Sequence, residues 1–370
     1  MTSRRVRIPP GSSTMSVVTR KTGPSYATLD ETTRAFGDFA ELDFDGEDVE
    51  PSDFSDFAIA AILRYAARVR RIRTNREVSN QAGTVAIVGS GSLASFLSPA
   101  LREAGYKITE IILRARPGAE AMRRGRALAR KVGAKAVGME NAALDASVLW
   151  LCVPDREIRA VAVALAKSGV STTRRGAARS RIAFHSSGAL LSDELAPLRS
   201  AGFAVASMHP LMTFVSGARP SLAGVPFAVE GDRAATKIAR RVVRDLGAES
   251  FILPARRKVA YHAWATMTSP LLVAYLATLE QAARQAGLAR EDARRMSLPI
   301  ILQTIENYGR LGPANSFSGP FIRGDAGTVA KHLALLKSDH LTRAVYVTLA
   351  RAALKRLPVK NRKELRRLLE

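Results

Sequence analysis

The sequence predicts an α/β protein whose core is a doubly wound parallel sheet, followed by an all-α C-terminal domain and preceded by a disordered leader. Three observations support this fold class. Short apolar segments alternate with amphipathic segments across residues 82–254, a glycine-rich turn follows the first apolar segment, and strand-like segments stop after Pro254. The 370 residues are sufficient for two domains with separate hydrophobic cores.

Residues 1–80 are expected to lie outside the folded domains. Residues 1–55 are rich in Ser, Thr, Gly and Pro, become strongly acidic from residue 38 onwards, and place their apolar residues at neither a helical nor a strand period. Residues 57–78 could form one amphipathic helix that ends in a basic cluster. A start codon assigned too far upstream would also produce such a leader, and the sequence leaves this alternative open.

A dinucleotide site is predicted where the first strand, residues 84–88, meets the first helix, residues 92–104. The intervening turn has the G-x-G-x-x-A spacing of a Rossmann-type domain. The glycines allow a tight turn and the close approach of a pyrophosphate, and free N–H groups at the helix start face the phosphates. The alternative is an ordinary strand-to-helix turn that binds no ligand. The candidate cofactor-binding residues of this turn are Gly89, Ser90, Gly91, Ser92, Leu93 and Ala94.

The end of the second predicted strand, residues 108–113, indicates NADP rather than NAD as the cofactor. NAD-binding domains of this type place an acidic residue near that point for the ribose hydroxyl, whereas this chain has Arg114 and Arg116. Two guanidinium groups can bind the 2′-phosphate of NADP, and no carboxylate is there to repel it. The alternative is that arginine at a strand end carries little information in a chain this rich in arginine.

Further strands and helices alternate up to Pro254, as a doubly wound sheet requires. The predicted strands are residues 134–137, 148–153, 182–185, 203–207, 226–229 and 250–253, and the further helices are residues 117–131, 155–167, 190–200 and 233–246. The first domain is therefore expected to span residues 82–254.

An all-α domain that binds substrate and forms dimers is expected over residues 255–358, followed by a basic tail over residues 359–370. Residues 259–279 carry no charge, but their His, Thr, Ser and Pro favour a buried helix over a membrane span. This stretch has more apolar surface than one small helical domain buries, so a homodimer is expected. The predicted helices are residues 256–286, 289–311, 325–337 and 339–357, the first two kinked at Pro270 and Pro299.

Residues that follow the strands are candidate ligand contacts, because open α/β sheets bind ligands at the carboxyl ends of their strands. Val153 and Pro154 end one strand, where the loop can cover a nucleotide. The next strand ends in His185, Ser186 and Ser187. The two hydroxyls are candidate contacts near the nicotinamide, and the imidazole of His185 is a candidate substrate contact.

Two further histidines are candidate proton donors in catalysis. His209 follows the strand at residues 203–207, and His262 begins the helical domain. Arg323 could hold a substrate carboxylate, or it could pair with Asp325, which suits the N-cap of the next helix. For both histidines the alternative is a structural role, with the imidazole hydrogen-bonded inside the protein.

The net charge of +23 does not indicate a nucleic-acid partner, because the basic residues are scattered and the aromatic residues do not interleave with them. Solvated surfaces are the preferred interpretation. The single cysteine, Cys152, cannot form an intrachain disulfide, and no signal peptide is recognisable, so a reducing cytoplasm is expected. The sequence has no metal-binding cluster, no Ser-His-Asp order and no Walker-type loop.

Taken together, these motifs resemble a known family. The order Val-Gly-Ser-Gly, Val-Pro-Asp, His-Ser-Ser-Gly-Ala, His-Pro-Leu, Tyr-His-Ala and Ser-Gly-Pro-Phe-Ile-Arg-Gly-Asp is similar to that of Rossmann-like proteins with a C-terminal domain of unknown function 2520. The resemblance covers residues 82 to about 357. Such proteins are similar in architecture to pyrroline-5-carboxylate reductase, ketopantoate reductase and the deazaflavin-dependent NADP oxidoreductases. The resemblance implies NADP binding, a helical dimerisation domain and a reductase activity without an assigned substrate.

The sequence therefore predicts a cytoplasmic NADP-dependent oxidoreductase that transfers a hydride between nicotinamide and a small carbonyl or imine substrate, with His209 or His262 as the proton donor. The alternative is a non-catalytic dinucleotide-binding sensor or scaffold. Two observations favour the alternative: Ser269 and Pro270 stand where the family often has Asn, and no Lys–acid catalytic pair is recognisable. A basic nucleic-acid-associated protein is a third, weaker possibility.

Overall fold

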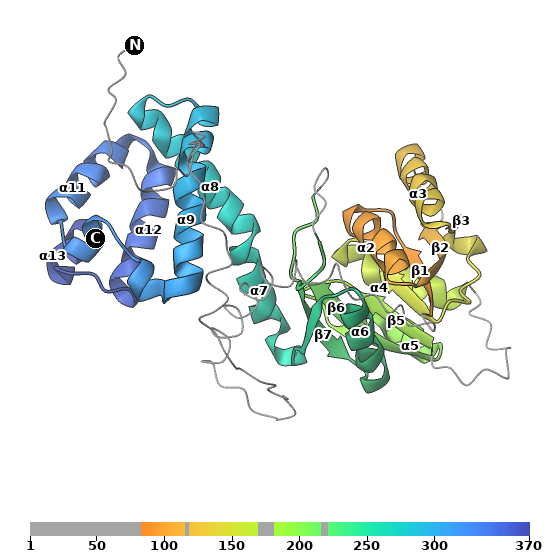
Figure 1. Cartoon of the computed structure of the whole chain (residues 1–370). Coiled ribbons are helices and arrows are strands. Elements are labelled where there is room, and N and C mark those ends of the chain that lie inside the picture. Colours follow the sequence, from red (N-terminus) through yellow and green to blue (C-terminus); the bar gives the residue numbers. More distant parts are fainter. Residues whose placement is uncertain (1–82, 115–117, 169–180, 216–220) are drawn as a thin grey trace, which may run out of the picture. The chain divides into compact units, whose positions relative to one another are not determined.

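The computed structural model describes residues 83–114, 118–168, 181–215 and 221–370. The predicted leader with its helix at 57–78, and Arg116, lie outside the described residues. The fold is an eight-stranded sheet with helices on both faces, followed by a helical region, which confirms the predicted fold class (Figure 1).

The sheet has the strand order β3-β2-β1-β4-β5-β6-β7-β8, so the chain runs outward from β1 in both directions. All neighbouring strands are parallel except β6 and β7, which are antiparallel and correct the prediction of a wholly parallel sheet. The strands are β1 (Thr84–Val88), β2 (Lys107–Leu113), β3 (Lys135–Gly138), β4 (Val148–Leu151), β5 (Arg181–His185), β6 (Phe203–Pro210), β7 (Pro226–Gly231) and β8 (Glu249–Ile252).

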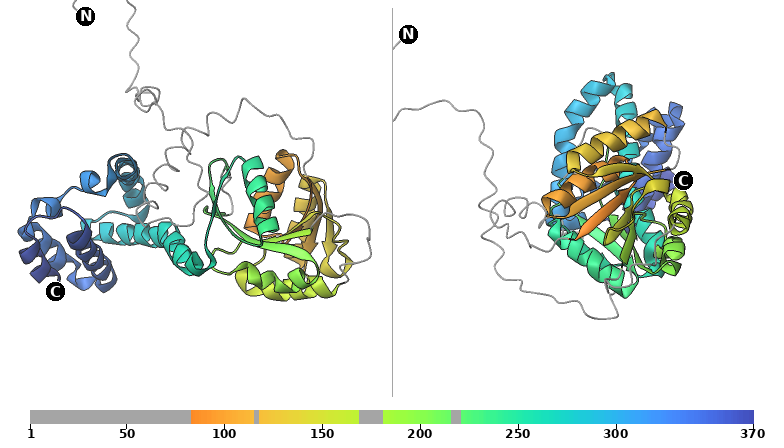
Figure 2. Two further views of the ribbon diagram at one scale, coloured as in Figure 1. Left: turned by 90° about the horizontal axis from the view of Figure 1, so that it is seen from below. Right: turned by 90° about the vertical axis from the view of Figure 1, so that its right-hand side faces the viewer.

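Helices cover both faces of the sheet, and the strand residues alternate between them. In β1, Val85 and Ile87 belong to one hydrophobic core and Ala86 and Val88 to the other. The first core includes α2 (Ser92–Glu103), α3 (Ala119–Val132) and α6 (Arg233–Asp245), and the second includes α4 (Asp155–Lys167) and α5 (Ala196–Ser200), as Figure 2 shows. Because both faces are buried, the strands read as continuous apolar runs.

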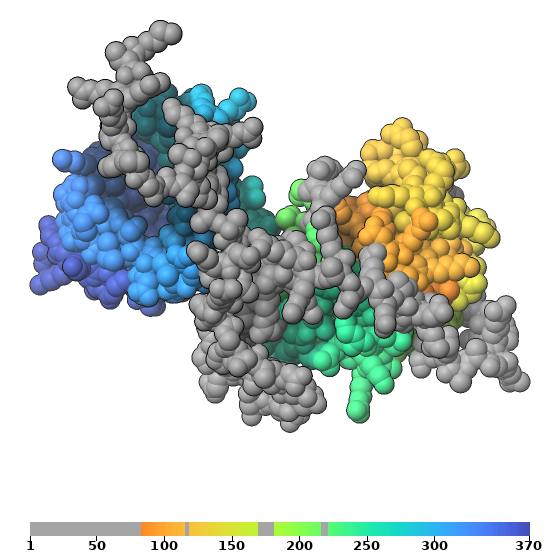
Figure 3. All heavy atoms as spheres, in the orientation of Figure 1, coloured from red at the N-terminus to blue at the C-terminus, as the bar shows by residue number. Residues whose placement is uncertain are grey.

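Strand β6 extends beyond its predicted end at residue 207. The antiparallel partner β7 supplies the reason: His209 pairs with Ala228 and Pro210 with Phe227. The extension places His209 inside the ladder rather than in a loop. Helices α2 and α3 pack against each other, and their surfaces adjoin in the space-filling view (orange and yellow in Figure 3).

The helical region begins with α7 (Lys258–Thr268) and α8 (Pro270–Ala283), which replace the single kinked helix predicted over residues 256–286. The break falls at Ser269, whose φ of −124° and ψ of −72° are not helical. Pro270 has no N–H with which to continue the helix, so it starts the next one.

Four further α-helices and several short helical turns complete the described part of this region. Helix α9 (Arg290–Ser316) continues through Pro299 and is interrupted at Gly312, directly after the predicted end of the helix at residue 311. Gly312 has a φ of +73°, which glycine tolerates without strain. The others are the turn α10 (Pro320–Arg323), then α11 (Ala326–Leu335), α12 (His340–Arg356) and α13 (Arg362–Leu369).

The C-terminal residues do not form a basic tail, as the sequence suggested, but the helix α13. Its Leu365 and Leu369 are buried in the core that α11 and α12 also form. The charged residues of the helix, Arg362, Lys363, Glu364, Arg366 and Arg367, are exposed, so the helical period was hidden by the charge of the segment. In the part of the chain that the structure describes, no helix is long and apolar enough to cross a membrane.

Candidate functional site

The glycine-rich turn between β1 and α2 has the geometry that a bound pyrophosphate requires. Gly89 has a φ of +112°, and a Cβ at this position would lie 2.4 Å from the carbonyl oxygen of Cys152, so only glycine fits. Gly91 is the N-cap of α2, and a Cβ there would meet nothing within 4 Å. The first turn of α2 contains no acidic residue, so its free N–H groups can donate hydrogen bonds to an anion.

The other residues of this turn differ in where their side chains point. Ala94 is fully buried against the sheet, as its small size predicts. The hydroxyl of Ser90 donates to the carbonyl oxygen of Ala121 at 3.4 Å, so its side chain is turned toward α3. Ser92 is exposed and Leu93 is half-buried. Of these residues, the main-chain N–H groups are therefore the groups best placed for phosphate.

Two neighbouring strand ends flank this turn. Arg114 follows β2 directly and is exposed, with no acidic residue at the end of the strand. Val153 follows β4, and its side chain would lie 3.4 Å from a Cβ on Gly89. Pro154 is the N-cap of α4. Arg114 and Val153 thus lie at the same edge of the sheet as the glycine turn, since all three strands are parallel.

The loop after β5 is built by its own polar side chains. His185 is fully buried, and its Nδ1 accepts a hydrogen bond from the Ser187 N–H at 3.1 Å while Nε2 lies 2.9 Å from the Leu191 carbonyl oxygen. Nε2 must therefore carry the proton. Burial and the charge of Lys258 lower the pKa of His185 to about 3, so the ring is neutral. His185 shapes the loop, and the structure gives its ring no exposed surface for the substrate contact that the sequence suggested.

The two serines of this loop are also engaged. Ser186 Oγ accepts a hydrogen bond from the indole of Trp150 at 2.8 Å. Ser187 Oγ donates to Asp155 at 2.6 Å and accepts from the N–H groups of Ala189 and Leu190. These bonds fix the loop at the N-terminus of α4. Contact of either serine with a nicotinamide stays a prediction.

The two histidines predicted as proton donors lie next to each other. The rings of His209 and His262 have centroids 6.2 Å apart. A Cβ on Gly188, in the loop after β5, would lie 2.9 Å from Nε2 of His209 and 2.6 Å from Cδ2 of His262. The end of β6, the start of α7 and the loop after β5 therefore meet at one point, and a side chain larger than that of Gly188 would force the imidazoles apart.

Tyr261 fixes the orientation of His209. Its hydroxyl lies 2.8 Å from Nδ1 of His209, and its ring is buried. Burial raises the pKa of Tyr261, so the hydroxyl keeps its proton and can donate it to Nδ1. Burial and the charges of His262 and Lys258 lower the pKa of His209 to about 4. A neutral His209 whose Nδ1 accepts from Tyr261 presents an Nε2–H toward Gly188.

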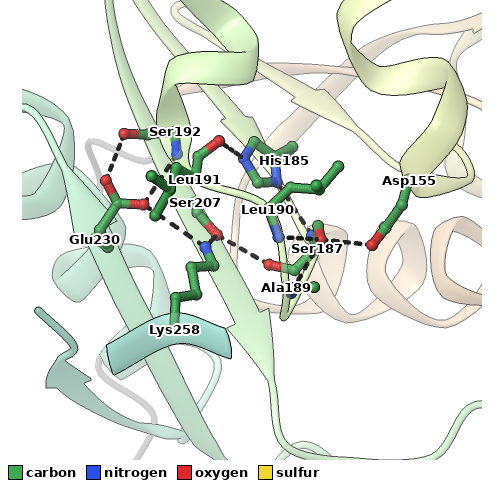
Figure 4. A network of polar contacts seen from close by, with 10 residues as sticks. All are labelled: Asp155, His185, Ser187, Ala189, Leu190, Leu191, Ser192, Ser207, Glu230 and Lys258. Carbon is green, nitrogen blue, oxygen red and sulfur yellow. Dashed lines mark hydrogen bonds and ion pairs between the residues drawn. The ribbon is translucent and has the colours of Figure 1, made fainter. Parts of the chain in front are cut away.

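Sequence reasoning missed Lys258, the most deeply buried charged residue of the site. It is 3% exposed, and its Nζ donates to Ser207 Oγ and forms an ion pair with Glu230 at 3.6 Å (Figure 4). No Lys–acid catalytic pair was recognisable in the sequence, whereas the structure brings Lys258 and Glu230 together as a buried ion pair. One signal could have revealed Lys258: with Tyr261 and His262 it shares one helix face at the i, i+3, i+4 spacing.

The last predicted site residue, Arg323, lies far from these groups along the sequence. It ends the short helix α10 and is exposed. Asp325 caps α11 as predicted, accepting from the Thr328 N–H at 2.9 Å and from its hydroxyl at 2.7 Å. These contacts leave the guanidinium of Arg323 in solvent, and its contact with a substrate stays a prediction. Among the described residues no three His, Cys, Asp or Glu side chains are grouped as a metal site would need.

Comparisons with known families divide the chain into two parts. Residues 70–210 match the Rossmann-like domain, and residues 225–353 match the domain of unknown function 2520. The second match begins at β7 and so includes the last two strands of the sheet as well as most of the helical region. No curated protein matched the sequence.

Solved structures share the fold over most of this chain. A proposed NADP oxidoreductase from Bacteroides fragilis aligns with a TM-score of 0.60 and 18% identity, covering 74% of this chain and 99% of that one. Protein TM1727 from Thermotoga maritima aligns with a TM-score of 0.55 and 23% identity, covering 77% and 98%. A 1-pyrroline-5-carboxylate reductase from Streptococcus pyogenes aligns with a TM-score of 0.49 and 14% identity, covering 78% and 98%. The first two alignments, at 18% and 23% identity, show a likeness of fold.

Proposed function

The chain joins a Rossmann-like domain to a domain of unknown function 2520, and from this premise we propose that it is an NADP-dependent oxidoreductase. The proposed reaction is hydride transfer between the nicotinamide and a small carbonyl or imine substrate. The observation that carries the proposal is the turn at Gly89 and Gly91, whose open N-terminal helix end suits a pyrophosphate.

The residues at the carboxyl edge of the sheet fit this cofactor. The main-chain N–H groups of Ser92, Leu93 and Ala94 at the start of α2 would hold the pyrophosphate, and Arg114 would bind the 2′-phosphate. Val153 and Pro154 would line the loop over the nucleotide. The cofactor would supply the hydride chemistry, while the protein supplies binding, orientation and electrostatics.

His209 is the proposed polarising group for the substrate oxygen or nitrogen. Its ring is neutral at pH 7 and can donate a hydrogen bond from Nε2, which is the role that a neutral imidazole with a lowered pKa plays in carbonyl chemistry. This differs from the general acid expected from the sequence, because a histidine with a pKa of about 4 is a weak source of protons at pH 7. His262, across from the same glycine, is the other candidate proton donor.

A homodimer formed through the helical region is part of the proposal. Helix α8 has no buried residue, although most of its side chains are apolar. Exposed large apolar side chains continue along α9, and a surface of this kind in a soluble protein usually meets a partner. We use the term apolar face of α8 and α9 for all the exposed large apolar side chains of these two helices, which are Leu271, Leu272, Val273, Tyr275, Met296, Leu298, Ile300, Leu302, Ile305, Tyr308 and Leu311.

The alternative function, a non-catalytic dinucleotide sensor or scaffold, rests on Ser269 and Pro270, where related proteins often have the amide of Asn. The two functions differ in turnover. We expect NADPH to bind more tightly than NADH, and absorbance at 340 nm to fall when a panel of small ketones, aldehydes and cyclic imines is added. Tight NADPH binding without turnover of any substrate would favour the sensor, and no binding of either dinucleotide would refute both. We place either protein in the cytoplasm, in keeping with the unpaired thiol of Cys152.

A further inference from the structure

Lys258 and Glu230 form a buried ion pair that the proposed reaction does not use. We propose that Lys258 is a positioning residue: its ammonium group, held by Glu230 and Ser207, sets the conformation of the loop after β5 and the electrostatic field at His209. The proposal rests on the proposed function for its consequence in catalysis, but the contacts that carry it are independent of any ligand.

The ammonium group of Lys258 joins three elements. Lys258 begins α7, and its Nζ reaches Ser207 on β6 and Glu230 on β7. Ser207 and Glu230 face each other in the antiparallel ladder, so the lysine bridges a matched pair of positions. Its side chain is 3% exposed, which means that water supplies little of its solvation. The two oxygen partners must therefore supply most of it.

Both partners of Lys258 also form hydrogen bonds with the loop after β5. Ser207 Oγ donates to the carbonyl oxygen of Ser187 at 3.0 Å. Glu230 accepts from the Ser192 N–H at 2.9 Å and from the Ser192 hydroxyl at 2.6 Å. Figure 4 shows this chain of contacts running from Lys258 through Ser207 and Glu230 to both ends of the loop. The loop after β5 contains Gly188, which lies beside His209 and His262. Both ends of this loop are therefore held by Ser207 and Glu230, the two residues that contact Lys258.

The charge of Lys258 also acts on the imidazoles directly. A cation makes protonation of a nearby ring less favourable, and Lys258 contributes to the lowered pKa of both His185 and His209. His209 faces His262, Tyr261 and Lys258 on α7 and His185 on β5. Lys258 in turn faces Glu230 on β7 and Asp155 on α4, whose charges favour its protonated form.

A purely structural role would make the same ion pair a tether between α7 and the sheet. The two interpretations differ in one measurable quantity. If Lys258 only tethers α7, a well-packed neutral replacement that keeps the fold leaves the protonation of His209 unchanged. If Lys258 sets the field, the same replacement makes His209 easier to protonate.

The experiment is an NMR titration of the five histidine rings in the ligand-free protein, with His209 assigned by the loss of its signal in His209→Gln. In the wild type we expect His209 to titrate well below the ordinary 6.5. In Lys258→Met with Glu230→Gln, which removes both charges at similar volume, the pKa of His209 should rise by about 0.3 unit, a twofold change in its protonation equilibrium, because burial and His262 still oppose protonation. The exposed Lys237→Met is the matched control and should leave it unchanged.

Each outcome decides the proposal. A wild-type pKa of His209 near 6.5, or no change in the folded double variant, would overturn it. If the double variant does not fold, as judged by near-UV circular dichroism, Lys258→Arg keeps the charge and should keep the low pKa of His209; a normal pKa there would also overturn it. Because the titration needs neither cofactor nor turnover, its result is separate from that of the NADPH assay. A protein that binds no dinucleotide would refute the proposed function and leave the titration unaffected.

Discussion

The sheet and the helices α7 to α9 use apolar residues in opposite ways. In β1, the four residues Val85 to Val88 are almost completely buried, because helices cover both faces of the sheet. Helix α8 is equally rich in apolar residues, yet none of its side chains is buried. The sheet is therefore complete within one chain, whereas the apolar face of α8 and α9 is not, and we expect a second copy of the chain to cover it.

The sharpest test of this difference compares one aromatic residue from each region. Phe184 on β5 is fully buried and packs edge-to-face on Trp150, whereas Tyr308 on α9 is 52% exposed. Phe184→Ala should lower the free energy of unfolding by about 3–5 kcal/mol through lost burial and a cavity. Tyr308→Ala should cost less than about 0.5 kcal/mol in the monomer.

Chemical denaturation at several protein concentrations measures both effects. A loss for Tyr308→Ala that grows with protein concentration would point to its burial in a dimer. A large loss that is independent of concentration would mean that α9 belongs to a core within the chain, which would break the comparison.

Self-association should respond to charge on the same apolar face. Val273 on α8 and Ile300 on α9 are 62% and 68% exposed. Replacing both with Glu should weaken self-association by about 100-fold or more, equivalent to about 2.8 kcal/mol, because two charges would be buried in an apolar interface. Sedimentation velocity measures the change. Leu341→Glu is the control, since Leu341 is as exposed but begins α12. A wild type that is monomeric at high micromolar concentration would refute the dimer.

The order of strands and helices could be predicted from the spacing of apolar residues. The same spacing explains which elements could not be predicted. The sheet could be predicted because its strands are short apolar runs with glycine turns between them. The antiparallel β6–β7 pair could not, since pairing direction leaves no mark on a buried strand. Helix α13 was hidden because only three leucines, Leu365, Leu368 and Leu369, stand among its many charged residues.

The candidate site shows the same division. The glycine turn could be predicted because its chemistry depends on local spacing, and so could the strand-end histidines. Lys258 and Glu230 could not be paired from the sequence, since they become neighbours only through the β6–β7 ladder and the path of α7. The buried state of His185 likewise depends on tertiary contacts, not on its place at a strand end.

Falling pH should destabilise the folded protein through the two buried histidines at the edge of the sheet. The pKa values of His185 and His209 lie near 3 and 4 in the folded protein and near 6.5 when unfolded. The unfolded chain therefore binds protons first as the pH falls below about 6.5, and the folded state loses stability from there down to about pH 4. Each histidine contributes at most about 1.4 kcal/mol per pH unit.

Urea denaturation at pH 7, 6, 5 and 4.5 measures this loss. His209→Gln, which keeps a hydrogen-bonding side chain but cannot be protonated, should make the slope of stability against pH shallower. The exposed Gln303→Ala on α9, which removes no titratable group, is the control and should leave the slope as in the wild type. Equal slopes in wild type and His209→Gln would show that His209 has an ordinary pKa in the folded protein.

The smallest expected effect concerns the exposed end of the sheet. Arg114 follows β2 directly and is exposed, and we expect its guanidinium to bind the 2′-phosphate of NADP. Arg114→Ala should weaken NADPH binding about tenfold, or about 1.4 kcal/mol, because the contact is exposed to solvent. NADH binding should not change, since NADH has no 2′-phosphate. Calorimetric titration of both dinucleotides measures the two affinities, with the exposed Arg130→Ala on α3 as the control. If NADPH and NADH bind the wild type equally, Arg114 does not select the cofactor, and the edge of the sheet would be specific for the pyrophosphate alone.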